Sequence, residues 1–206
     1  MRTTLNLQFL AVLALALGLF GQPITELNSP STTNSHLAVS GPNFAAPEPE
    51  VDALIVSLLR IGANVIALDK TISTLQLHED SVSLMQAQME AINRSIEDMN
   101  AQALALDYLD PVQSKRVTSN TVILKPTYTH LLKVIAEQKG AIWVLQFGKP
   151  MHDWLGDFRT LLLVGNVVLN AILTIPDGAL IEAAWALQDR EFPPVQALFH
   201  GPYPEL

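Results

Sequence analysis

The sequence of 206 residues contains no cysteine. Cysteine nucleophiles, thiolate metal ligands and disulfide redox chemistry are therefore excluded as the basis of its function. The absence does not decide the compartment, because a secreted domain of this size can be stable without disulfides when its core is large enough.

Positive charge is also scarce. Lys and Arg number 12 against 20 Asp and Glu, which gives a formal net charge of −8. The sequence has no cluster of basic residues, and phosphate contacts from such residues supply most of the affinity for nucleic acids. We therefore expect no nucleic acid partner, and no electrostatic attraction to anionic membranes.

Signatures of catalysis are missing as well. The sequence has no G-x-S-x-G nucleophile elbow and no glycine-rich phosphate loop. Paired carboxylates occur at the ends or on the polar faces of the expected helices. No two of the five histidines have the spacing of metal ligands on a helix; they are His36, His78, His130, His152 and His200. We therefore predict a non-enzymatic protein with no catalytic residue, metal site or cofactor.

The residues that are abundant are aliphatic. Hydrophobic residues make up 49% of the chain and aromatic residues only 6%, which is typical of a helical core. Two stretches carry apolar residues in alternating steps of three and four, which predicts an antiparallel helical hairpin. The first stripe is Val51, Leu54, Leu58, Ile61, Val65, Leu68, Ile72 and Leu75, and the second is Val82, Met85, Met89, Ile92, Ile96, Met99, Ala103 and Leu106.

Three further helices are expected, over residues 110–139, 150–174 and 179–190. Pro126 lies inside the first of them, so we expect a kink or a break near Leu124. The second is apolar nearly all round from Thr160. Its apolar run is about 16 residues long and contains Asn166 and Asn170, so it is favoured as a buried core helix over a transmembrane span, which needs roughly 20 residues. No strand is convincing, and the fold class predicted is an all-α antiparallel bundle of about five helices after a disordered N-terminal arm.

The chain divides into four parts by composition. Residues 1–21, with Arg2 followed by an apolar run of about a dozen residues, are predicted to be a secretory signal peptide. Residues 22–46, rich in Ser, Thr, Asn and Pro, are predicted to be a disordered linker. The bundle is assigned to residues 47–192 and a Pro-rich tail to residues 193–206. We therefore expect a secreted, extracellular protein whose mature chain has no transmembrane segment.

Methionine placement gives a first indication of function. Met85, Met89 and Met99 all lie on the stripe of the second helix, and none lies on its polar face. They either form an ordinary core or line a cavity that accommodates lipid between the helices. The candidate apolar lining is Ile61, Val65, Leu68, Met85, Met89, Ile92, Ile96, Met99, Leu131, Ile135, Phe158, Leu161 and Leu162.

The sequence contains one N-x-S/T glycosylation acceptor, formed by Asn93, Arg94 and Ser95. It lies at the edge of the apolar seam of the second helix. Glycosylation of Asn93 requires that this edge be exposed.

Two segments carry a family resemblance. They are Val65-Ile66-Ala67-Leu68-Asp69 and the stretch from Leu124-Lys125-Pro126 through Leu131-Leu132 to Lys139, which an aromatic residue, Trp143 or Phe147, follows near a turn. Over about residues 51–185 the chain resembles fungal hydrophobic surface binding protein A and the related cell wall galactomannoproteins. The resemblance implies an extracellular or wall-associated helical bundle that adsorbs to hydrophobic surfaces, and some members of the family take fatty acids into the bundle core.

The resemblance and the residues together favour a secreted protein that binds fatty-acid-like lipids or hydrophobic surfaces. The Ser/Thr-rich region common after the domain in wall mannoproteins is missing, which favours free secretion over wall attachment, with cell wall or other secreted proteins as further candidate partners. The alternative is a secreted interaction module or effector that uses an exposed helical face. An enzyme would need a convergent polar cluster inside the bundle, which the sequence does not reveal.

Overall fold

The computed structural model describes residues 46–75 and 79–201. The predicted signal peptide, and all of the predicted linker except Ala46, lie outside the described residues. Within the described ranges the regular structure is helical, and no strand is present. The prediction of an all-α bundle is confirmed.

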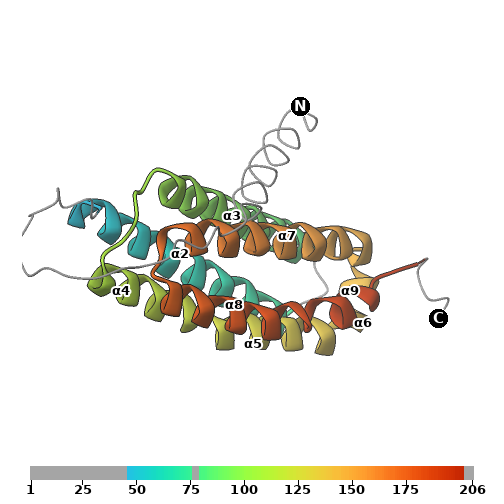
Figure 1. Cartoon of the computed structure of the whole chain (residues 1–206). Coiled ribbons are helices and arrows are strands. Elements are labelled where there is room, and N and C mark those ends of the chain that lie inside the picture. Colours follow the sequence, from blue (N-terminus) through green and yellow to red (C-terminus); the bar gives the residue numbers. More distant parts are fainter. Residues whose placement is uncertain (1–45, 76–78, 202–206) are drawn as a thin grey trace, which may run out of the picture. The chain divides into compact units, whose positions relative to one another are not determined.

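Six of the helices form the length of the bundle, and two short ones close one end of it (Figure 1). The prediction of about five helices holds when the two halves of the broken third helix, α4 and α5, are taken together. The helices are α2 (Glu48–Ser73), α3 (Glu79–Leu104), α4 (Pro111–Val122), α5 (Lys125–Glu137), α6 (Lys139–Val144), α7 (Gly148–Ile172), α8 (Ile175–Asp189) and α9 (Phe192–Ala197).

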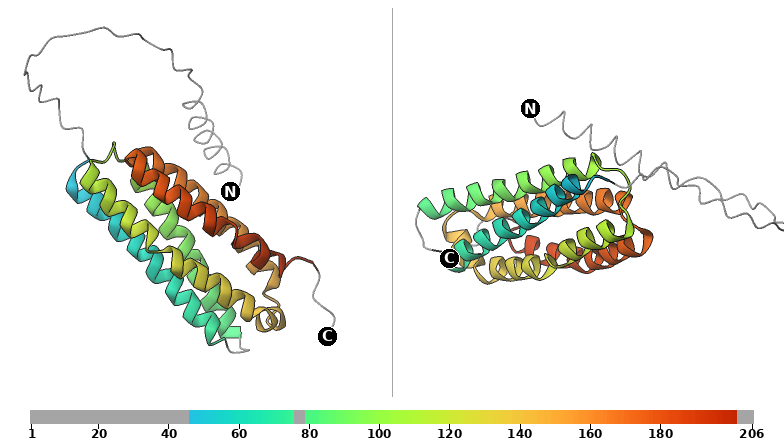
Figure 2. Two further views of the ribbon diagram at one scale, coloured as in Figure 1. Left: turned by 60° about the horizontal axis from the view of Figure 1, so that its bottom comes forward. Right: turned by 90° about the vertical axis from the view of Figure 1, so that its left-hand side faces the viewer.

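The predicted hairpin is present as α2 and α3, which make the most extensive helix–helix contact of the bundle. α3 packs on α7, and α2 packs on both α4 and α5. α8 packs on α7 and on α4, and so lies across the bundle from the hairpin (Figure 2). The apolar stripes of α2, α3, α5 and α7 all face one shared core.

α4 and α5 replace the single third helix, as Pro126 predicts. Asp110 caps α4, because its carboxylate accepts hydrogen bonds from the backbone N–H groups of Val112 (2.8 Å) and Gln113 (2.9 Å). The regular helical hydrogen bonding is interrupted at Ile123 and Leu124, whose backbone dihedrals stay in the right-handed helical region, and α5 begins at Lys125. This break positions the candidate site described below.

Packing continues beyond residue 192, where the sequence pattern placed the end of the bundle. Phe192 and Phe199 are both buried, and the ring of Phe192 contacts that of Phe158 edge-on at 5.5 Å between centroids. Pro193 and Pro194 lie in the first turn of α9, where the missing N–H groups are not needed. Part of the predicted Pro-rich tail is therefore a short helix, and the aromatic residues in and after it cover one end of the core.

Among the described residues, α2 and α7 are long and apolar enough, by length and composition alone, to cross a membrane. Both place an apolar stripe in the bundle core. In α7 this stripe includes Trp154, Phe158 and Leu162, all buried. The packing agrees with the expectation that residues 150–174 form a core helix.

Candidate functional site

The break between α4 and α5 follows from the chemistry of Pro126. Proline has no N–H group, so the carbonyl of Val122 cannot receive the bond that would continue the helix. The N–H of Leu124 instead bonds to the carbonyl of Thr121 at 3.2 Å. Leu124 packs against Gly62 of α2 so closely that a Cβ on that glycine would lie 2.7 Å from the Cδ2 atom of Leu124.

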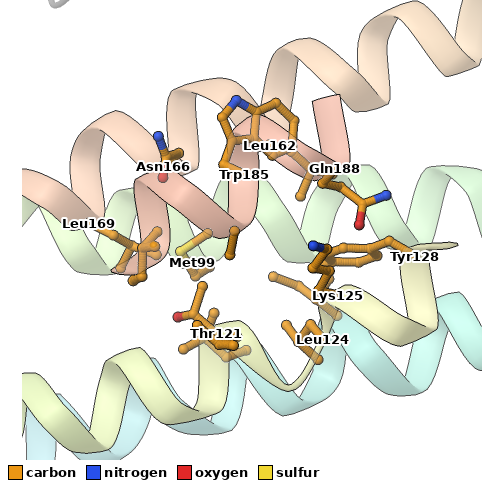
Figure 3. A pocket seen from close by; sticks show the side chains of 16 residues that line it. Met99, Thr121, Leu124, Lys125, Tyr128, Leu162, Asn166, Leu169, Trp185 and Gln188 are labelled. Carbon is orange, nitrogen blue, oxygen red and sulfur yellow. The ribbon is translucent and has the colours of Figure 1, made fainter. Parts of the chain in front are cut away.

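A pocket of about 70 Å³ lies beside this break, between α4 and α5 on one side and α7 and α8 on the other (Figure 3). Its wall is mostly aliphatic and aromatic, with a few polar side chains. The lining residues are Leu58, Ile61, Met99, Thr121, Val122, Leu124, Lys125, Tyr128, Leu162, Gly165, Asn166, Leu169, Ile181, Ala184, Trp185 and Gln188.

Tyr128 occupies one side of the pocket and is 8% exposed. Its ring contacts Phe158 edge-on at 5.8 Å between centroids, and Phe158 in turn stacks on Trp154 at 4.9 Å. Burial raises the pKa of the Tyr128 phenol, which therefore stays protonated and can donate a hydrogen bond. The hydroxyl forms no hydrogen bond with any residue that the structure describes.

Lys125 and Gln188 lie on the same side of the pocket as Tyr128 (Figure 3). Gln188 is almost fully buried, and its Nε2 donates to Glu191 Oε2 at 3.2 Å. Thr129 Oγ1 donates to the same carboxylate oxygen at 2.8 Å. Lys125 is half-buried, and within the described part of the chain no carboxylate lies within ion-pair distance of its ammonium.

The opposite side of the pocket is formed by Met99, Gly165 and Asn166. A Cβ on Gly165 would come within 2.9 Å of Asn100 Oδ1 and 3.0 Å of Met99 Cε, so a larger residue would displace one of these side chains. Both polar atoms of Asn100 are buried without a hydrogen-bond partner, as is Oδ1 of Asn166. The polar side chain that this side presents to the pocket is therefore the neutral amide of Asn166.

α8 covers the pocket with Ile181, Ala184, Trp185 and Gln188. Only three of its fifteen residues are buried, and two of these, Ile181 and Gln188, line the pocket. The middle of α8 is therefore held mainly by the residues that would contact a ligand.

Polar contacts fasten α8 at both ends. At its start, Ser114 Oγ of α4 donates to Asp177 Oδ2 at 2.6 Å and accepts from the N–H of Thr174 at 2.9 Å. At its end, Arg159 of α7 contacts both oxygens of Asp189, at 2.5 and 2.9 Å. The hydrogen bond from Arg159 holds the pKa of Asp189 below its usual range.

The structure brings part of the predicted lining into this pocket. Ile61, Met99 and Leu162 line it, and Leu161 is half-buried elsewhere on α7. Of the three methionines singled out in the sequence, Met85 and Met89 pack in the core, and Met99 alone reaches the pocket. The other predicted lining residues are buried in the core without lining the pocket: Val65, Leu68, Met85, Met89, Ile92, Ile96, Leu131, Ile135 and Phe158.

The polar residues of the pocket are absent from the predicted set. Thr121 and Tyr128 are at helical spacing from Leu131 and Ile135 in the third predicted helix and so share their face, but only apolar residues were selected as lining. Pro126 was the usable signal, since a break inside an amphipathic helix leaves space beside it and Lys125 directly precedes it.

The candidate glycosylation site is engaged in packing. Asn93 is half-buried, and its Oδ1 accepts a hydrogen bond from Trp154 Nε1 at 3.1 Å. Ser95 is buried and accepts from Asn64 Nδ2 at 2.6 Å. This arrangement disfavours glycosylation of Asn93 in the folded domain.

Within the described ranges, no group of three or more His, Asp or Glu side chains could hold a metal ion. The polar groups that line the pocket are one ammonium, one phenol, one threonine hydroxyl and two amides. Such groups bind and orient a ligand by hydrogen bonding and charge.

No protein-family model matches the sequence, and no curated protein matches it. Two solved structures share the fold. AfMP4p in complex with palmitic acid superimposes with a TM-score of 0.71 at 20% identity, over 72% of this chain and 99% of that one. Ligand binding domain 1 of the Penicillium marneffei MP1 protein, complexed with arachidonic acids, gives a TM-score of 0.68 at 11% identity, over 74% and 99% of the two chains. The chain therefore has the helical fold of these two proteins.

Proposed function

We propose that this protein is a non-enzymatic binding protein that takes the hydrocarbon chain of a fatty-acid-like lipid into the pocket between α4–α5 and α7–α8. One observation carries the proposal: a helix break opens an apolar pocket in a fold shared with proteins solved in complex with palmitic and arachidonic acids. The pocket walls, with Leu58, Ile61 and Leu169, supply the apolar contact that a hydrocarbon chain requires. Burial of apolar surface contributes roughly 25 cal/mol per Å².

The pocket must widen to hold a long chain. Its volume of about 70 Å³ is well below the roughly 300–1,000 Å³ of typical ligand sites. Met99 and Leu124 have flexible side chains that can rotate, and α8 is lightly buried between its two fastened ends. We therefore propose that α8 moves away from α5 when the ligand enters.

Substitution on the α8 wall of the pocket tests the proposal. Ala184→Leu adds bulk on the side of α8 that lines the pocket, and leucine is a good helix former. Filling the space should weaken binding of palmitic acid by about tenfold or more, since overpacking costs on the order of 1–3 kcal/mol. The measurement is displacement of a bound fluorescent probe by palmitic acid.

Ala183→Leu is the matched control, because Ala183 directly precedes Ala184 on the same helix and its side chain is exposed. Its affinity for palmitic acid should equal that of the wild type. Equal affinities for both variants would contradict the location of the site. A wild-type protein that binds no fatty acid would overturn the function itself.

A second candidate function is adsorption to hydrophobic surfaces, and the outer face of α2 favours it. Val56, Leu59 and Ile66 are 53, 52 and 57% exposed. Their spacing of three and seven places them on one stripe of the helix. An exposed apolar stripe is typical of a contact with another apolar surface.

Replacing these three residues by serine should reduce adsorption of the protein to a hydrophobic solid without changing its affinity for palmitic acid. Leu180→Ser with Leu187→Ser is the control, because these leucines are equally exposed but lie on α8. Equal adsorption of all three proteins would exclude the α2 stripe as the contact.

We also propose that the protein is secreted and acts outside the cell. The charged start and short apolar run of residues 1–21, together with the resemblance to fungal hydrophobic surface binding protein A and the galactomannoproteins, support this localisation. N-terminal sequencing of protein recovered from culture medium tests it, and recovery of the full chain from the cells alone would contradict it.

A further inference from the structure

Lys125, the cation that lines the pocket, has no counter-ion among the described residues; the end of the pocket at Lys125 is called its mouth below. Lys125 begins α5, and its half-buried side chain lines the pocket. Glu191, the carboxylate that Thr129 and Gln188 contact nearby, is engaged by those two donors. The chain has a formal charge of −8, yet this lysine beside an apolar pocket has no acidic partner in the described structure. Its ammonium can therefore bind the anionic group of a ligand.

A second, independent observation points to the same place. Tyr128 is 8% exposed and lines the pocket, yet its hydroxyl has no hydrogen-bond partner within the described ranges. A hydroxyl of a pocket-lining residue that donates to no protein group is free to donate to a ligand. Lys125 and Tyr128 are three residues apart on α5, which places them on the same face of the helix.

An ammonium and a neutral phenol together match a carboxylate. A carboxylate accepts hydrogen bonds and carries one negative charge, and charge-assisted hydrogen bonds are stronger and shorter than neutral ones. The opposite side of the pocket, formed by Met99, Gly165 and Asn166, has one neutral amide and no cation, so a carboxylate there would lose its hydration without a compensating charge. The anionic end of a ligand therefore belongs at the mouth.

We infer that Lys125 and Tyr128 form a carboxylate subsite, so that the ligand is an unesterified fatty acid. Its head group lies at the mouth of the pocket, and its chain runs inward toward Met99 and Leu169. This inference depends on the proposed function, because it requires that the pocket take a lipid chain. It adds the chemical class of the head group and the direction of the ligand.

A purely structural role for the two residues makes a different prediction. A solvated lysine at the start of a helix and a tyrosine packed on Phe158 would give no preference for an acid over its ester. The test is therefore a comparison of palmitic acid with methyl palmitate, which share the hydrocarbon chain and differ in charge at the head. Displacement of the neutral fluorescent probe N-phenyl-1-naphthylamine measures both affinities.

Wild-type protein should bind palmitic acid about tenfold more tightly than methyl palmitate. Lys125→Met keeps the unbranched stem and removes the charge, so it should abolish the preference without weakening binding of the ester. Tyr128→Phe keeps the contact with Phe158 and should reduce the preference several-fold. Lys133→Met, at an exposed lysine of the same helix paired with Glu137, should behave as the wild type.

The outcomes separate the inference from the proposed function. Equal wild-type affinities for acid and ester, or an unchanged preference in Lys125→Met, would overturn the carboxylate subsite and leave the lipid pocket in place. Failure of both ligands to displace the probe would overturn the proposed function and the subsite together. The comparison of the two ligands on the wild type requires no variant to fold.

Discussion

At the scale of single residues, three asparagine side chains in the described part of the chain each have at least one buried polar atom without a hydrogen-bond partner. Asn100 is 5% exposed and lacks a partner on both polar atoms, while Asn166 and Asn170 lack one on Oδ1. Glycines make room for two of them, since a Cβ on Gly165 would lie 2.9 Å from Asn100 Oδ1 and one on Gly178 would lie 2.8 Å from Asn170 Oδ1. Unsatisfied buried groups cost about 1–3 kcal/mol each, so this region is not optimised for stability.

Asn100→Leu should therefore stabilise the protein by about 1–2 kcal/mol, because a leucine of similar shape removes the unpaired amide and adds apolar burial. Urea denaturation measures the change in the free energy of unfolding. Asn64→Leu is the control and should destabilise, since Asn64 donates to Ser95 Oγ at 2.6 Å across two helices. A loss of stability in Asn100→Leu would mean that an ordered solvent molecule or a ligand satisfies its amide.

The residues of the candidate subsite show what a sequence can and cannot predict at this scale. Tyr128 could be placed on an inner face from the steps of its stripe alone. The sequence cannot predict that Tyr128 and Lys125 lack a partner. That property depends on which side chains of α8, and of the turn after it, face α5. Charge counting identifies a scarce lysine, but only the folded chain shows that Glu191 is already engaged by Thr129 and Gln188.

At the scale of elements, α8 covers the pocket and is held mainly at its two ends. Its first residues are fixed by Ser114, Thr174 and Asp177, and its last by Arg159 and Asp189. Between these ends it buries few side chains. Motion of α8 away from α5 would therefore require the polar contacts at one end to loosen.

A disulfide between α4 and the start of α8 tests this motion. The hydroxyl oxygens of Ser114 and Thr174 are 3.2 Å apart, and the chain has no other cysteine, so Ser114→Cys with Thr174→Cys should form one defined bond. Closing this loop should raise stability by about 4 kcal/mol on the chain-entropy model. If α8 moves at this end, the association rate of palmitic acid should fall by about tenfold in the oxidised protein and recover on reduction.

Stopped-flow measurement of probe uptake gives both rates. The reduced form of the same variant is the control for the two substitutions. Equal rates in the oxidised and reduced forms would show that α8 does not have to move at its start.

The elements themselves were largely predictable, because each follows from a local rule. Steps of three and four define α2 and α3, Asp110 caps α4, and Pro126 separates α4 from α5. α9 was not predicted, because Pro193 and Pro194 suggested an irregular tail. The burial of its aromatic residues depends on contacts that only the folded bundle makes.

At the scale of the whole molecule, the stripes predict one shared core but not where that core is incomplete. Most residues expected to line a cavity are well packed, because the interior of a bundle normally closes to high density. The pocket forms at the break between α4 and α5, where the regular pattern stops. An account of the cavity therefore needs helix adjacency, which the periodicity of single helices does not contain.

Ligand removal should lower the stability of the whole bundle. A ligand that binds only the folded state stabilises it by about 2.7 kcal/mol at 100 times its dissociation constant. For a domain of this size each kcal/mol corresponds to roughly 2–4 °C, so stripping bound lipid should lower the melting temperature by about 5–10 °C. Calorimetry before extraction, after extraction and after addition of palmitic acid measures the effect. Stripped protein whose melting temperature does not rise on addition of palmitic acid would contradict lipid binding, because a ligand that prefers the folded state must raise it.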